Sequence, residues 1–183
     1  MKTLYLDLGM GAAGDMLTGA LLELMPDREA ALEQLNHLGL PHTQFSMERG
    51  SKCGISGTHI HVTVLGQEEQ PCQDLPQHEH HHEHADEHEH DYGHHHDHSH
   101  GHHHSHTAMA DIRQAVQALS VSDAVKARVL EVYARIAQAE SQVHGVSVSE
   151  IHFHEVGTLD ALADITAVCL LMDRLAPERV VVS

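Results

Sequence analysis

Histidine dominates one part of this sequence. Residues 78–106 hold 16 of the 23 histidines and seven acidic residues, and no histidine run is longer than three. Neutral imidazoles bind nickel, copper and zinc, and a flexible chain can gather several around one ion. Such a chain loses conformational entropy when it becomes ordered around an ion. It would therefore bind several ions exchangeably rather than hold one tightly. We predict a metal reservoir; the alternative is a hydrophilic loop without a role. The clustered histidines expected to serve it are His80, His81, His82, His94, His95, His96, His102, His103 and His104.

A second group of possible ligands lies in residues 151–160, Ile-His-Phe-His-Glu-Val-Gly-Thr-Leu-Asp. Side chains two positions apart on an extended chain point to the same side, so His152 and His154 could chelate one ion. Glu155 and Asp160 add carboxylate oxygens close by. These four residues are the predicted metal ligands. The alternative is a solvated strand followed by a helix whose dipole favours an acid in its first turn.

His59 and His61 repeat the His-x-His spacing without an acid near them in sequence. A solvated strand face is the preferred interpretation of this pair.

Small residues follow the first apolar run and lead into a helix. The backbone amides of such a turn and the start of the helix can bind a phosphate, which makes Asp7, Gly11, Gly14 and Asp15 candidate substrate or phosphate ligands. No Walker lysine is present, and Asp15 would repel a phosphate unless a cation lay between them. A tight packing turn is the alternative.

The charge balance limits the partners. There are 27 acidic and 10 basic residues, a formal net charge of −17, which disfavours nucleic acid and anionic lipid surfaces. No apolar window is long enough to span a membrane, and acids interrupt the N-terminal apolar stretch, so we expect a cytoplasmic protein. The three cysteines form no CxxC pair and are expected to be buried or incidental thiols.

Hydrophobic periodicity predicts the elements that must position these residues. Strands are expected near 3–8, 44–50, 58–65 and 179–183, together with about five helices. Ser122 and Thr158 are expected to cap the starts of two of these helices, and Gly145 is expected to end the first of the two. The predicted fold class is α+β, a mixed α and β domain with a small sheet. Residues 1–65 form its N-terminal part, 66–107 are a disordered histidine-rich insertion, and 108–183 complete the same domain. The strand expected at 179–183 has no visible partner in the sequence, which suggests that this chain is one part of a longer or split protein.

Taken in order, these features resemble the LarC family of nickel-insertion proteins. Members have an N-terminal strand that ends in Asp and runs through a Gly-rich turn to Gly-Asp-Met, here residues 7–16. A histidine-rich insertion follows, and then His-Phe-His-Glu-Val-Gly, here residues 152–157, with Asp160 and Asp164 after it. The resemblance covers essentially the whole chain.

The resemblance implies a nickel chelatase, a lyase that inserts Ni²⁺ into pyridinium-3,5-bisthiocarboxylic acid mononucleotide. This nucleotide-derived small molecule would become the nickel-pincer cofactor of lactate racemase or a relative, the recipient enzyme. The family reaction consumes CTP, with Mg²⁺ or Mn²⁺, through a C-terminal half that this chain lacks and that would be its partner. The sequence leaves homo-oligomerisation open.

Two other functions fit the residues less fully. A non-catalytic nickel or zinc store, or a metallochaperone, would need only the histidine tract. A metal-dependent hydrolase is weaker, because no further histidine-rich motif downstream completes a hydrolytic site.

Overall fold

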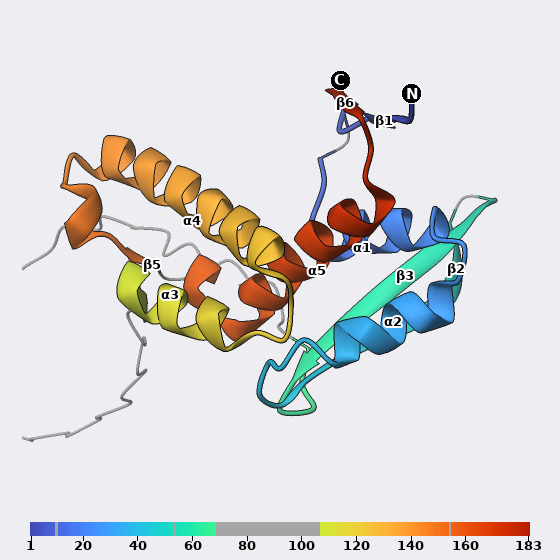
Figure 1. The fold of residues 1–183 in the computed structure, drawn as a ribbon, viewed down its shortest axis with the longest axis horizontal. Helices are drawn as coiled ribbons and strands as arrows, with labels where there is room; N and C mark the ends of the chain where they lie inside the picture. Colours follow the sequence, from blue (N-terminus) through green and yellow to red (C-terminus); the bar gives the residue numbers. More distant parts are fainter. Residues whose placement is uncertain (10, 53, 69–106, 154) are drawn as a thin grey trace, which may run out of the picture. The chain divides into compact units, whose positions relative to one another are not determined.

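The computed structural model describes residues 1–183 except 10, 53, 69–106 and 154 (Figure 1). The predicted reservoir histidines and most of the predicted insertion 66–107 therefore lie outside the described residues. The strands are β1 (Thr3–Leu6), β2 (Thr43–Lys52), β3 (Ile55–Val64), β4 (Thr107–Ala108), β5 (His152–Phe153) and β6 (Arg179–Val182). The α-helices are α1 (Gly14–Glu23), α2 (Arg28–Asn36), α3 (Met109–Ala118), α4 (Asp123–His144) and α5 (Leu159–Leu175), and two 3₁₀ turns are η1 (Val148–Glu150) and η2 (Glu155–Gly157). The predicted α+β class is confirmed.

Local sequence accounts for the helix ends. The hydroxyl of Ser122 accepts a hydrogen bond from a backbone N–H in the first turn of α4, and Thr158 does the same for α5. Gly145 ends α4 with φ 67°, a left-handed conformation that glycine adopts without strain. Both caps and this stop are as predicted from the sequence, because each depends on neighbours within one helical turn.

The strands pair in three sheets of two strands each within the described part of the chain. β2 and β3 form a long antiparallel hairpin, and β4 pairs with β5 in the same sense. β1 and β6 run parallel, with Thr3 opposite Arg179 and Leu6 opposite Val182. The prediction that the last strand has no partner is wrong, since β1 supplies one from the other end of the sequence.

Helix α5 contributes to two clusters of buried side chains. Its residues Ala163, Ala167 and Leu171 pack with the hairpin, α1 and α2, whereas Leu162 and Cys169 pack with α3 and α4. This double burial explains why α5 is apolar around most of its circumference. Cys169 is the buried thiol that sequence analysis expects, and Cys53 and Cys72 lie outside the described residues.

The sequence on both sides of the histidine tract belongs to one compact unit, made of Met1–Glu69 and Ser105–Ser183. Within the described residues, no helix has both the length and the apolar character needed to cross a bilayer.

Candidate metal centre

Short strand β5 holds His152 at the surface. Ala108 of β4 lies opposite His152, which is exposed, while the next residue, Phe153, is buried. The ring of Phe153 meets that of Tyr133 edge to face, with centroids 5.6 Å apart. The Tyr133 hydroxyl donates a hydrogen bond to the backbone oxygen of Val156 at 3.1 Å. Buried aromatic contacts thus anchor the segment and leave His152 facing outward.

The other predicted ligands near His152 are only partly described. His154 and the side chain of Glu155 lie outside what the structure describes. Asp160 is half-buried in the first turn of α5, directly after the cap Thr158. His152 on β5 and Asp160 on α5 thus lie on either side of η2 in the sequence. The set of four ligands stays a prediction.

The Gly-rich turn meets α5 at one close contact. A Cβ built on Gly14 would lie 2.5 Å from both Cβ and Cγ of Asp164, far closer than real Cβ contacts. Only glycine lets the start of α1 approach the second turn of α5 in this way. The first and last motifs of the sequence resemblance are consequently in contact in the folded chain.

The other three candidates in the turn, Asp7, Gly11 and Asp15, each have a local structural role. The Oδ1 atom of Asp7 accepts hydrogen bonds from the N–H of Gly9 and the hydroxyl of Ser183, both at 3.2 Å. Gly11 has φ 83°, which a residue with a side chain would strain to adopt. Asp15 lies in the first turn of α1, where the helix dipole favours a carboxylate. These contacts shape the turn, and phosphate binding there stays a prediction.

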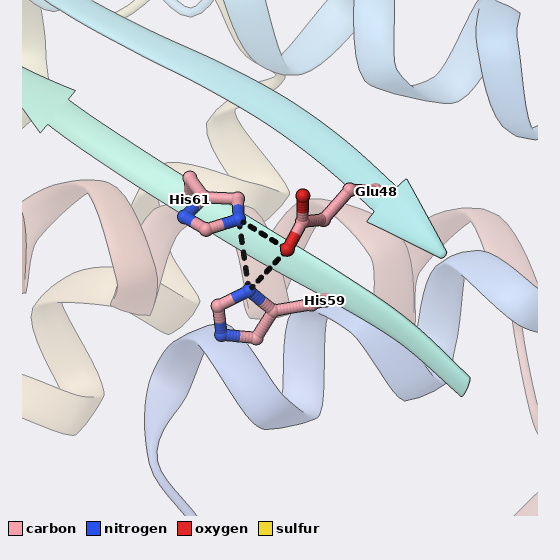
Figure 2. Close-up of side chains that lie close together, drawn as sticks. All are labelled: Glu48, His59 and His61. Atoms are coloured by element: carbon pink, nitrogen blue, oxygen red, sulfur yellow. Dashed lines mark hydrogen bonds and ion pairs between the residues drawn. The ribbon is translucent and has the colours of Figure 1, made fainter. Parts of the chain in front are cut away.

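A different cluster of donor atoms lies on the hairpin. Glu48 of β2 is directly opposite His59 of β3, and His61 follows two positions later on the same face. Figure 2 shows the three side chains converging from the two strands. Nδ1 of His59 lies 2.9 Å from Nε2 of His61, and Oε1 of Glu48 lies 3.2 Å from Nε2 of His61 and 3.8 Å from Nδ1 of His59.

Acids are thus close to this histidine pair, contrary to the expectation from sequence. Besides Glu48, Oε1 of Glu68 accepts a hydrogen bond from Nδ1 of His61 at 2.5 Å. The hydrogen bonds with Glu68 and then Glu48 raise the pKa of His61 above its usual value. The register that brings Glu48 opposite His59 depends on strand pairing, so spacing along the chain could not reveal it. Among the described residues, Glu48, His59 and His61 are the one group of histidine, cysteine or acidic donors close enough together to share an ion.

Imidazole nitrogens and carboxylate oxygens that converge on one point suit a divalent transition metal. The chain belongs to the nickel insertion protein family, whose model matches residues 4–183. This match confirms the resemblance to the LarC family.

Curated relatives agree with the family model. The chain is 40% identical over its full length to the pyridinium-3,5-bisthiocarboxylic acid mononucleotide nickel insertion protein of Clostridium acetobutylicum, of which it covers 43%. It is 36% identical to the protein of the same name from Lactiplantibacillus plantarum, covering 40% of that protein. A putative nickel insertion protein of Geobacter sulfurreducens is 31% identical, with 38% of it covered. The chain therefore spans about two fifths of the length of these relatives, and no solved structure matches it.

Proposed function

We propose that this chain is the nickel-supplying part of a chelatase that inserts Ni²⁺ into pyridinium-3,5-bisthiocarboxylic acid mononucleotide. Family membership carries the proposal, together with the contact between Gly14 and Asp164. That contact brings the Gly-rich turn against α5, the helix that directly follows the segment with the predicted nickel ligands. Substrate bound at Asp7, Gly11, Gly14 and Asp15 would then lie beside the helix that carries Asp160.

The proposed chemistry is ligand exchange. His152, His154, Glu155 and Asp160 hold the Ni²⁺ that is to be inserted, as nitrogen and oxygen donors. The two thiocarboxylate sulfurs of the substrate are softer donors and displace these ligands as nickel moves to the nucleotide. No protein nucleophile is needed. The exposure of His152 on β5 supports this role, because a ligand that must release its ion needs access to the incoming substrate.

The chain's coverage of about two fifths of its relatives supports a role for a C-terminal half as partner. In this proposal the C-terminal half binds CTP with Mg²⁺ or Mn²⁺, the product is the nickel-pincer cofactor, and lactate racemase or a relative in the cytoplasm receives it.

The test is cofactor formation by the chain together with its C-terminal half, at limiting Ni²⁺. His152→Ala and His154→Ala should each lower the rate, and the double variant should abolish it. His144→Ala is the matched control, since His144 is also exposed but lies at the end of α4, and it should leave the rate unchanged. Full activity in the double variant would rule out these ligands.

Metal storage is the second candidate, favoured by the 16 histidines of residues 78–106. Removing residues 78–106 separates the two functions. A store would lose nearly all of its metal capacity and its biological effect, whereas the chelatase should keep its activity when nickel is plentiful.

A further inference from the structure

We infer that Glu48, His59 and His61 form a second transition-metal site on the β2–β3 hairpin, with Glu68 as the outer carboxylate that orients His61. This site is separate from the predicted ligands around His152. It does not depend on the proposed nickel insertion, because the hairpin would bind metal in a protein that inserts none.

The spacing of the donor atoms fits an ion. Two donors that each lie about 2.1 Å from a metal are about 3.0 Å apart at a right angle, about 3.4 Å apart at the tetrahedral angle and about 3.8 Å apart near 130°. The three separations in the cluster are 2.9, 3.2 and 3.8 Å. All three atoms can therefore reach one ion without a change in the hairpin backbone.

The ring of His61 turns one nitrogen toward each carboxylate. Nδ1 of His61 is the nitrogen that meets Glu68, so Nε2 is the ring atom that faces Oε1 of Glu48 at 3.2 Å and Nδ1 of His59 at 2.9 Å. In the absence of metal a proton on Nε2 can donate to Glu48. A metal ion that replaces this proton would be held by Nε2 of His61, Nδ1 of His59 and Oε1 of Glu48 together.

The contact with Glu68 has the form that metal sites use. A metal-bound histidine generally donates its second ring N–H to a carboxylate or carbonyl, which fixes the ring and strengthens the ligand. Glu68 makes this contact with His61 from beyond the end of β3. A solvated strand face would not require this arrangement.

The donors also indicate the class of ion. Two imidazole nitrogens and one carboxylate oxygen suit nickel, zinc, cobalt or copper better than magnesium or calcium. The side chains of His59 and Glu48 are 53% and 64% exposed, so water can complete the coordination and the ion can exchange. The site follows the architecture of an open centre with three protein ligands. Because Glu68 precedes the first histidine of the tract, His78, by ten residues, ions held by the tract would be concentrated near the hairpin.

The test is a Ni²⁺ titration of the full chain, followed by site-resolved NMR of the backbone amides. Signals from residues 47–49 and 59–61 should shift or broaden in the native chain and stay unchanged in His61→Ala. Glu48→Gln preserves the shape of the side chain and should also suppress the response. The matched control is His144→Ala: His144 pairs with Glu140 at 3.1 Å but, among the described residues, belongs to no group of three metal donors, so its loss should leave the hairpin response intact.

Glu68→Gln should weaken Ni²⁺ binding at the hairpin by about 10- to 100-fold, the usual cost of losing an outer-shell carboxylate. The ring ¹⁵N shifts of His61 should show a loss of its preference for the proton on Nδ1 in this variant. No response of the native hairpin, or the same response in His61→Ala and Glu48→Gln, would overturn the site. Unchanged affinity and ring shifts in Glu68→Gln would overturn the role of Glu68.

Discussion

Replacement of Gly14 by alanine tests the close approach of α1 and α5. The added methyl carbon would lie 2.5 Å from both Cβ and Cγ of Asp164. Non-bonded carbon atoms are comfortable at about 3.5–4.0 Å, so the two helices would have to separate by about 1 Å. A new rotamer of Asp164 cannot relieve the clash, because the backbone of α5 sets the position of its Cβ. Such overpacking costs about 1–3 kcal/mol.

Part of this cost is offset by helix propensity. Alanine is better than glycine in a helix interior by about 1 kcal/mol, and the gain is smaller at the first residue of α1. We therefore expect Gly14→Ala to lower the free energy of unfolding by about 1–2 kcal/mol. Urea denaturation followed by circular dichroism measures this change directly.

The control is Gly57→Ala, because a Cβ on Gly57 has no neighbour within 4 Å. This variant should not lose stability. A double-mutant cycle with Asp164→Gly, which removes the clashing atoms, should show a favourable coupling of about 1 kcal/mol or more. Unchanged stability in Gly14→Ala, or zero coupling in the cycle, would refute the close packing of the two motifs.

Three further predictions concern the α4 and α5 side of the core. Tyr133→Phe removes the hydrogen bond to Val156 and should cost about 1 kcal/mol in urea unfolding; no change would mean that the bond contributes nothing. Ser122→Ala removes the cap of α4 and should also cost about 1 kcal/mol, which Ser122→Thr should largely restore. Burial raises the pKa of Cys169 from its usual 9.0 to about 11, so the thiol should resist iodoacetamide at pH 8 in the folded chain, with labelling located by mass spectrometry. Its contribution to stability is full below pH 9 and is lost as the pH rises through about 11; rapid labelling of the native protein would contradict this burial.

Sequence reasoning succeeds wherever the determining interactions are local. The hydroxyls of Ser122 and Thr158 accept hydrogen bonds from residues three positions later, and these spacings predict the starts of α4 and α5. Alternating apolar residues likewise predict the hairpin strand that buries Ile60 and Val62. These are the elements whose type and approximate bounds the structure confirms.

Sequence reasoning fails where strands pair. The partner of β6 is β1, from the opposite end of the sequence, and no periodicity within either strand encodes that pairing. The same reason explains the error at the hairpin, where β-sheet register places the carboxylate of Glu48 beside His59 and His61.

The sequence by itself determined the family, the α+β class and the abundance of metal-binding side chains, because motifs and composition can be read without coordinates. Only the tertiary structure decided which donors share a surface. In the folded chain Glu48 lies beside the histidine pair and makes a cluster of three donors on the hairpin, and Gly14 lies against Asp164. Both results depend on distances between residues of different strands or helices, which packing and strand register set and local propensity does not.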